Sequence, residues 1–390
     1  MPKTGPQVYL WGWYGHKNSG DDALLKVISR TILQVSPTTG ITIGIPEDGQ
    51  VPPLPNVVRV NRPIHRFKGY ILFSKIISVL GTNALVFGGG SAMSDISKAR
   101  MDGLRFHRWI CTAAKLKRIP IIFSALGLGP LITERGKSLT RDILNSAVLV
   151  DVRDSDSYEL CKKLNVTSQV IQSFDPAVLI PELFYPDLTR RRYNGRHLPT
   201  VGISLSGSPG TVQVEEHQQK IKIANLARAI KHTAASLPLQ VAGIEMCGDD
   251  IYGDKQLIER LLNDLDNVCE VKTISYCLDP VDMMRQLAGL DAIIAERLHA
   301  AVYAYTLGIP FAVVPYHAKC KAFARDIGLP DALLLEPEMP TTQVEQVLKL
   351  MLNEPDACSP ALAVDQASRL AQSGQEAILD TLRKLLSSTG

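Results

Sequence analysis

Short apolar segments typical of buried strands alternate with helical segments along this chain, and this alternation limits the possible folds more than any other feature. In the first half, "VYLWGWYG", "ALVFGGG" and "IPIIFSALGLG" indicate strands, while "DDALLKVISRTIL" places its apolar residues on one helical face. Strands separated by helices form right-handed βαβ units, in which the strands are parallel. The sequence therefore predicts an α/β protein built on parallel sheets.

The alternation is interrupted once, by a stretch rich in proline and charge at about 184–199, and it then restarts with strands such as "TVGISLS" and "DAIIAE". A chain of 390 residues exceeds a single hydrophobic core, so two domains are expected. We predict Rossmann-like domains at 1–190 and 198–355, whose parallel sheets face a cleft. A long amphipathic helix within 360–390 is suited to packing back on the first domain.

The composition excludes several classes of protein. A net charge of +3 is too small for a nucleic-acid-binding footprint. The seven cysteines are odd in number and contain no C-x-x-C pair, which is typical of neither a disulfide framework nor a zinc site. The amino terminus lacks the apolar region of a signal peptide, and no apolar stretch reaches the roughly 18 residues of a membrane-spanning helix. We expect a cytoplasmic protein without a metal site, and the oligomeric state stays open.

A first glycine-rich loop, "GWYGHKNSGDDALL" at 12–25, follows the first strand. It brings Asn18, Gly20 and Asp21 to the start of a helix, with Asp21 as a candidate N-cap. Free backbone N–H groups at such a position can hold an anion or a sugar hydroxyl. The spacing matches neither the dinucleotide-binding nor the P-loop fingerprint. A tight turn that needs glycine for its backbone angles remains the alternative.

A second glycine-rich loop, "VFGGGSAMSD" at 86–95, follows another strand. Glycines such as Gly89 and Gly90 let the backbone approach a ligand closely, and Asp95 could accept a proton from a hydroxyl group. Loose packing in a turn is the alternative. A third loop, "ALGLGP" at 125–130, repeats the pattern. The three loops together favour ligand binding more than any one of them alone.

Arg153 and Asp154 stand directly after a further strand, in "VDVRDSDSYEL". An internal arginine–aspartate pair, or a helix cap formed by Asp154, would account for them. Alternatively, Arg153 could reach across the cleft as an anion clamp. Asp175, which precedes a proline, is more typical of a turn than of a catalytic group.

Basic residues gather in the second half, where "ERLHA" and "PYHAKCKAF" follow successive strands. Arg297 and His299 begin one helix and Lys319 begins the next, so the three should line one pocket at the carboxyl ends of neighbouring strands. Basic groups at helix amino termini are suited to a small anion with several charges. A buried histidine with a structural role is the alternative for His299.

Taken together, these motifs resemble those of the polysaccharide pyruvyl transferase family. The resemblance rests on motifs in the family's order between about residues 8 and 328, namely "GWYGHKNSGDDALL", "FGGGSAMSD", "VRDSDSYE", "DPAVLI", "ERLHAAVYA" and "GIPFAVVPYHAKC". It implies a GT-B-like fold and transfer of a pyruvyl group from phosphoenolpyruvate to a cell-envelope glycan, as a cyclic ketal. Family members often have an aspartate–proline pair before the lysine, where this chain has His317 and Ala318.

The resemblance also implies roles for the residues singled out above. Phosphoenolpyruvate, a co-substrate rather than a cofactor, would be held by basic residues, and His299 would be the general acid. The acceptor sugar would lie on the first domain. The base for the attacking hydroxyl is not identified by the resemblance, and Asp95 and Asp21 are the candidates. The phosphoenolpyruvate-binding residues are Arg153, Arg297, His299 and Lys319, and the acceptor-binding residues are Asn18, Gly20, Asp21, Gly89 and Gly90.

Two other functions remain open from the sequence. A GT-B glycosyltransferase would use a nucleotide sugar, and Glu296 could then bind the ribose hydroxyls. A non-catalytic sugar-binding module would keep the fold without the chemistry. The expected partners are phosphoenolpyruvate and a glycan or lipid-linked saccharide. A lipid-linked acceptor would imply peripheral contact with the inner face of a membrane, although no strongly amphipathic basic helix stands out in the sequence.

Overall fold

The computed structural model describes most of the chain, and the residues it describes fall into two compact units. The described residues are 5–55, 58–61, 68–188, 197–206, 216–250 and 253–387. The first unit is drawn from Met1–His16, Asp21–Leu179 and Ala367–Gly390, and the second from Lys17–Gly20 and Ile180–Gln366.

The division between the units differs from the expected boundary at 190. The second unit already begins at Ile180, because α6 (Ile180–Phe184) contacts α9 (Pro280–Leu287) of that unit. Residues 189–196 of the predicted linker lie outside the described residues. The four residues Lys17–Gly20 join the second unit although they belong to the first glycine-rich loop.

The first unit is built on a parallel sheet of seven strands in the order β3-β2-β1-β4-β5-β6-β7. The strand order reverses between β1 and β4, and in open α/β sheets a ligand binds beside such a reversal, at the carboxyl ends of the strands. The first glycine-rich loop follows β1 as predicted, whereas Gly88–Gly90 of the second predicted loop lie within β4 itself. The strands are β1 (Gln7–Trp11), β2 (Gly40–Gly44), β3 (Val58–Asn61), β4 (Ala84–Met93), β5 (Ile121–Leu128), β6 (Leu149–Val152) and β7 (Gln169–Gln172).

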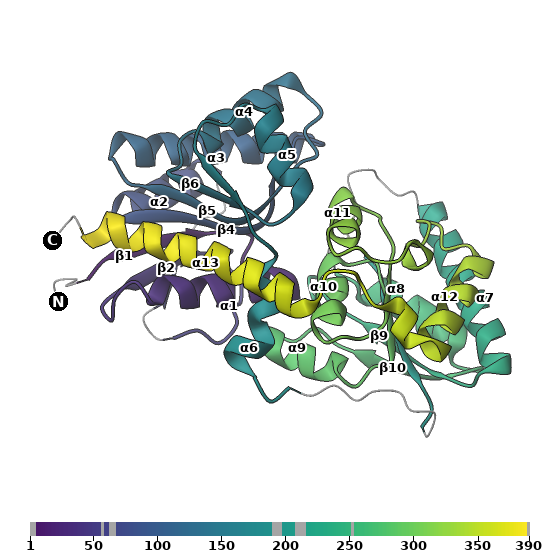
Figure 1. The fold of residues 1–390 in the computed structure, drawn as a ribbon. Helices are drawn as coiled ribbons and strands as arrows, with labels where there is room; N and C mark the ends of the chain where they lie inside the picture. Colours follow the sequence, from purple (N-terminus) through teal and green to yellow (C-terminus); the bar gives the residue numbers. More distant parts are fainter. Residues whose placement is uncertain are drawn as a thin grey trace. The chain divides into compact units, whose positions relative to one another are not determined.

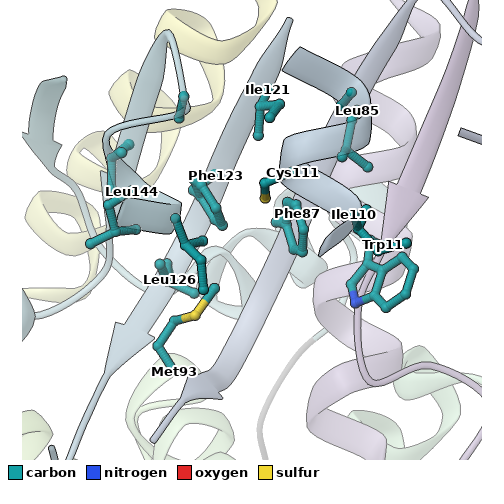
Figure 2. Packing of buried hydrophobic residues seen from close by; sticks show 14 of the residues in the cluster. Trp11, Leu85, Phe87, Met93, Ile110, Cys111, Ile121, Phe123, Leu126 and Leu144 are labelled. Carbon is teal, nitrogen blue, oxygen red and sulfur yellow. The ribbon is translucent and has the colours of Figure 1, made fainter. Parts of the chain in front are cut away.

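Helices cover both faces of this sheet, as expected for parallel strands that are apolar on both sides (Figure 1). On one face lie α2 (Lys68–Leu80), α3 (Lys98–Leu116), α4 (Glu134–Leu144) and α5 (Ser155–Lys163), over a core with aromatic rings such as Phe87 and Phe123 (Figure 2). On the other lie α1 (Ser19–Leu33) and α13 (Val364–Ser387). Ile378, Leu382 and Leu386 of α13 pack into the core of this face.

The second unit is built on a parallel sheet of five strands in the order β10-β9-β8-β11-β12. Its order reverses between β8 and β11, so the loop that follows β11 lies at the expected place for a ligand. The strands are β8 (Thr200–Ser204), β9 (Gln240–Ile244), β10 (Glu270–Ile274), β11 (Ala292–Ala295) and β12 (Phe311–Val313). The remaining helices are α7 (Glu216–Ser236), α8 (Lys255–Leu265), α10 (Leu298–Thr306), α11 (Ala318–Asp326) and α12 (Thr341–Asn353), with 3₁₀ turns at Pro176–Leu179, Asp331–Leu333 and Pro355–Cys358.

Candidate functional site

The candidate donor site lies where β11 passes into α10. Arg297 occupies the N-cap position of α10, and His299 lies in the first turn. The next strand along the sheet, β12, leads in the same way to α11, whose second residue is Lys319. Because β11 and β12 are parallel neighbours, the amino termini of α10 and α11 lie at the same edge of the sheet. The structure therefore brings the three basic residues to one edge of the second unit.

Asp254 fixes the orientation of Arg297. One oxygen of the Asp254 carboxylate accepts hydrogen bonds from Nε of Arg297, at 3.0 Å, and from Nη2. The other oxygen accepts from the backbone N–H groups of Met246 and Cys247, at 3.1 and 3.0 Å. The side chain of Asp254 is fully buried and that of Arg297 is 11% exposed. Burial alone would lower the pKa of Arg297, but the charge of Asp254 raises it. Arg297 is thus charged and held in one position.

The segment Lys17–Gly20 is hydrogen-bonded to the loop that follows β9. Ser19 donates its N–H to the carbonyl of Met246 at 3.0 Å, and Gly248 donates to the carbonyl of Lys17 at 2.9 Å. Asn18 and Cys247 form an antiparallel bridge between these two bonds. Asp254 also holds the same loop, so one carboxylate connects Arg297 with this segment.

Gly20 packs directly against His299. A Cβ atom at position 20 would lie 1.8 Å from Nδ1 of the His299 ring, so only glycine leaves room for the ring as it stands. The hydroxyl of Tyr303, one turn further along α10, donates to the carbonyl of Ser19 at 2.8 Å. These contacts place Gly20 beside the predicted general acid, and they explain the glycine by packing rather than by contact with a sugar.

The start of α1 differs from the prediction. The helix begins at Ser19, and the side-chain oxygen of Asn18 accepts the N–H of Gly20 at 3.1 Å. Asn18, and not Asp21, therefore supplies the cap. Asparagine is among the preferred N-cap residues, so the sequence allowed either choice.

Lys319 is positioned by a histidine where the family often has an acidic residue. His317 is the N-cap of α11, and its Nδ1 accepts the backbone N–H of Lys319 at 3.3 Å. The substitution thus keeps a side-chain acceptor at the cap.

Glu296 is part of a buried ion pair. Its two carboxylate oxygens accept hydrogen bonds from Nζ of Lys222 at 2.7 and 2.8 Å, and one of them also accepts the backbone N–H of Ser206 at 2.9 Å. Both charged side chains are almost completely buried. Glu296 therefore holds α7 to the sheet of the second unit.

Arg153 lies in the first unit and forms an internal pair. Its Nη1 donates to Asp175 at 2.7 Å, and both side chains are about 95% buried. Asp154 caps α5 by accepting the N–H of Ser157 at 2.8 Å. The internal pair and the helix cap considered from the sequence are both present. The role of Arg153 as an anion clamp stays a prediction.

Asp95 also lies in the first unit, and its contacts argue against the predicted role as a base. Its oxygens accept the backbone N–H groups of Ile132 and Thr133 at 2.6 and 2.8 Å, together with the Thr133 hydroxyl. Burial alone would raise the pKa of Asp95, but these hydrogen bonds lower it. A Cβ atom on Gly136 would lie 2.1 Å from the carboxylate, so α4 packs tightly against it. Asp95 shapes the loop after β5 and is a poor proton acceptor.

The glycine-rich loop that follows β1 contacts the glycines within β4 at the reversal of strand order in the first sheet. Gly89 and Gly90 have φ angles of +55° and +81°, which favour glycine. A Cβ atom at Gly89 would lie 2.4 Å from Leu24, and one at Gly90 would lie 3.3 Å from the carboxylate of Asp21. Of the five predicted acceptor-binding residues, Asp21, Gly89 and Gly90 come together here. Asn18 and Gly20 instead belong to the second unit.

Two residues of the donor site were not predicted. Asp254 directly precedes α8, and in the sequence it has the appearance of an ordinary helix N-cap. Nothing in the sequence indicates that it pairs with Arg297. Tyr303 lies four residues after His299, and this helical spacing was the only signal of their proximity.

No group of three or more histidine, cysteine, aspartate or glutamate side chains in the described part of the chain is arranged to hold a metal ion. Among the helices described, none is both long and apolar enough to cross a bilayer.

Comparison with known proteins identifies one family. The family model for polysaccharide pyruvyl transferase matches residues 18–318. The amylovoran biosynthesis protein AmsJ of Erwinia amylovora is 22% identical over 258 residues, which are 64% of this chain. The alignment spans only 60% of the length of that relative.

Solved structures confirm the predicted fold class. A putative UDP-N-acetylglucosamine 2-epimerase from Listeria monocytogenes has a TM-score of 0.61 at 10% identity, covering 96% of this chain and 95% of its own. The lipopolysaccharide outer core galactosyltransferase WaaB has a TM-score of 0.53 at 10% identity, covering 98% and 100%. Identities this low establish the GT-B-like fold of two parallel-sheet units and nothing about substrates.

Proposed function

Because the chain belongs to the polysaccharide pyruvyl transferase family, we propose that it transfers the pyruvyl group of phosphoenolpyruvate to two hydroxyls of a glycan sugar, forming a cyclic ketal and releasing phosphate. The observation that carries this proposal is the grouping of Arg297, His299 and Lys319 at the amino termini of two neighbouring helices. Helix amino termini and cationic side chains both favour a small anion with several charges.

The negative charges of phosphoenolpyruvate match the cationic residues at this edge of the second unit. Phosphoenolpyruvate carries a carboxylate and a phosphate, so at least two cationic groups are needed to hold it. Asp254 holds the guanidinium of Arg297 in one position. Binding of phosphoenolpyruvate would therefore cost little conformational entropy of this side chain. Lys319 supplies a second charge from α11. The two cations would stabilise the phosphate as it leaves.

The reaction is balanced without any further reagent. The terminal carbon of phosphoenolpyruvate takes a proton and becomes a methyl group, which makes the central carbon electrophilic. One sugar hydroxyl attacks that carbon, the bond to the phosphate oxygen breaks, and the second hydroxyl closes the ketal. Of the two hydroxyl protons, one balances the proton taken by the methyl group and the other leaves with phosphate.

His299 is the proposed general acid for the protonation of that carbon. Histidine is the side chain that most often transfers a proton in enzyme active sites. Its ring is confined between Gly20 and the first turn of α10, which restricts it to a narrow range of positions. Proton transfer from a positioned group contributes roughly 10²–10⁴-fold to a rate.

The acceptor sugar is proposed to bind the first unit where the glycine-rich loop after β1 contacts the glycines of β4. Asp21 beside Gly90 is the remaining candidate for the base that activates a hydroxyl. Trp13, which follows β1, is 59% exposed and stacks on His16 with ring centres 3.9 Å apart. An exposed indole held flat in this way offers an apolar surface for the C–H face of a sugar.

A nucleotide-sugar glycosyltransferase is the weaker alternative. A glycosyltransferase of this kind would need a carboxylate to bind the ribose hydroxyls, and Glu296 is the candidate for it. The contacts of Glu296 with Lys222 and Ser206 leave it poorly suited to this role. The likeness to enzymes that bind UDP-sugars concerns the fold alone.

Product analysis tests the proposal and separates it from both alternatives. The purified chain would be incubated with phosphoenolpyruvate and with free or lipid-linked saccharides from a cell envelope. We expect phosphate release that requires both substrates, and a product from which mild acid frees pyruvate. Consumption of a nucleotide sugar instead would establish the glycosyltransferase. Binding of saccharide without any turnover would establish the non-catalytic module.

A further inference from the structure

The outer sides of α2 and α3 expose an unusual amount of apolar surface. Of the twelve large apolar side chains that are exposed among the described residues, five lie on these two helices. We call this surface the α2–α3 face. It consists of Phe73, Ile77, Leu80, Trp109 and Leu116, which are 62%, 53%, 36%, 63% and 80% exposed.

The two helices lie on the same side of the first sheet, so their outer sides face the same way (Figure 1). Their inner sides are already used, because Val79 of α2 and Cys111 of α3 pack into the core against the sheet (Figure 2 shows Cys111 beside Phe87). Helix α2 is therefore apolar on both sides. A helix of this kind normally has its second side covered as well.

The surroundings of the α2–α3 face are strongly basic. Residues 98–118, which include α3, contain seven basic residues and one acidic residue, a net charge of +6 against +3 for the whole chain. Arg105 and Arg108 form ion pairs with Asp102 and Asp142. Beside Leu116, the end of α3 carries the exposed residues Lys115, Lys117 and Arg118. The apolar surface thus has a basic rim at one end.

We propose that the α2–α3 face docks on the surface of an anionic lipid bilayer. Tryptophan and bulky aliphatic side chains insert at the boundary between head groups and acyl chains, and nearby lysines and arginines bind anionic head groups. Stable peripheral binding usually needs these two contributions together, and this face supplies both. A second copy of the chain is a poorer occupant, because a two-fold symmetric contact would bring together two copies of the segment 98–118, each with a net charge of +6.

This inference does not depend on the proposed reaction. Combined with the proposed reaction, membrane docking implies that the acceptor is a lipid-linked saccharide, which the enzyme reaches while the first unit lies on the membrane. The two ideas fail separately, because binding to vesicles requires neither phosphoenolpyruvate nor an acceptor.

Vesicle binding of the full chain tests the proposal. Co-sedimentation would compare vesicles of phosphatidylcholine alone with vesicles that also contain phosphatidylglycerol, at low and high salt. We expect binding to the anionic vesicles only, weakened by salt. Phe73→Ser combined with Trp109→Ser, and separately Lys115→Glu combined with Lys117→Glu, should each weaken binding by at least about tenfold. Equal binding to both vesicle types, or to neither, would overturn the proposal.

Matched variants elsewhere on the surface serve as controls. Val268→Ser removes an exposed apolar side chain and Lys255→Glu reverses an exposed charge, both in the second unit, and neither should change vesicle binding. Unchanged melting temperatures would show that the variants fold. If Trp109→Ser turned an oligomer into a monomer in light scattering and left vesicle binding intact, the face would be an interface between copies instead.

The position of contact can be measured directly. Lipids with brominated acyl chains quench tryptophan fluorescence at short range. Quenching should be lost in Trp109→Phe, which keeps an apolar side chain, and kept in Trp13→Phe. The opposite pattern would place the membrane contact at the glycine-rich loop and overturn the assignment to α2 and α3.

Discussion

The carboxyl edges of the two sheets differ in how their charged residues are grouped. In the first unit, Arg153 and Asp95 point inward and satisfy buried partners, Asp175 and the loop at Ile132. In the second unit, Arg297 is also paired, but His299 and Lys319 accompany it at the starts of two adjacent helices. A charged residue after a strand is therefore not by itself a sign of ligand binding. The grouping of several such residues on neighbouring strands is the more informative signal.

Replacing the proposed general acid should have the largest effect on activity. His299→Ala should lower turnover by roughly 10²–10⁴-fold while the protein stays folded, because the proton donor is lost. The matched control is His232→Ala, an exposed histidine on α7, which should leave turnover unchanged. Full activity of His299→Ala in a phosphate-release assay would remove the proposed mechanism.

Breaking the internal pair of the first unit should chiefly affect stability. Asp175→Ala leaves the buried guanidinium of Arg153 without its carboxylate and should lower the free energy of unfolding by about 3–5 kcal/mol. The exposed pair of Arg285 and Asp282 is the control, and Asp282→Ala should cost less than about 1 kcal/mol. Urea unfolding measures both. A small effect for Asp175→Ala would mean that Arg153 is not held by this pair and is available as an anion clamp.

The substitution Gly20→Ala tests whether position 20 must be glycine to leave room for the ring of His299 in the second unit. Gly20→Ala places Cβ against the ring of His299, so we expect a loss of stability of about 1–3 kcal/mol and reduced turnover. Gly103→Ala, in α3, meets nothing within 4 Å and should stabilise the protein by roughly 0.5–1 kcal/mol. Thermal melting and turnover would be recorded for both. Normal turnover with a raised KM for the acceptor would instead place Gly20 at the sugar.

The smallest expected effect concerns Asp95. Its pKa is lowered in the folded protein, so its contribution to stability is present above the pKa of about 3.9 in the unfolded chain and is lost as the pH falls. Asp95→Asn should cost about 1 kcal/mol at neutral pH, flatten the loss of stability in acid, and leave turnover nearly unchanged. A large loss of turnover with normal stability would restore Asp95 as the base.

The fold was predictable because its main signals are local. Buried parallel strands are continuous apolar runs, and most helices between them show a period of 3.6. Helix α2 was not predicted, since "KGYILFSKIISVL" is much more apolar than the other surface helices and is apolar on more than one side. The short strand β7, "QVIQ", carries too few apolar residues to stand out.

The candidate site was predictable only in part, because partners in space leave no trace in a single sequence. Arg297, His299 and Lys319 could be grouped from the order of strands and helices alone. That Asp254 holds Arg297, and that Asn18 and Gly20 pack in the second unit, depends on contacts across more than forty residues of sequence. For the same reason Asp95 could not be recognised as structural, since its partners lie in the loop after β5.

Calorimetric titration of phosphoenolpyruvate tests the central claim most directly. The wild-type chain would be titrated with phosphoenolpyruvate and with UDP-sugars, alongside Lys319→Ala and the control Lys321→Ala, which removes an exposed lysine of the same helix. We predict that the wild-type chain binds phosphoenolpyruvate and does not bind UDP-sugars. The affinity for phosphoenolpyruvate should fall at least about tenfold in Lys319→Ala, equivalent to about 1.4 kcal/mol, and stay unchanged in Lys321→Ala. Binding of a UDP-sugar with none of phosphoenolpyruvate would contradict the account and favour glycosyl transfer.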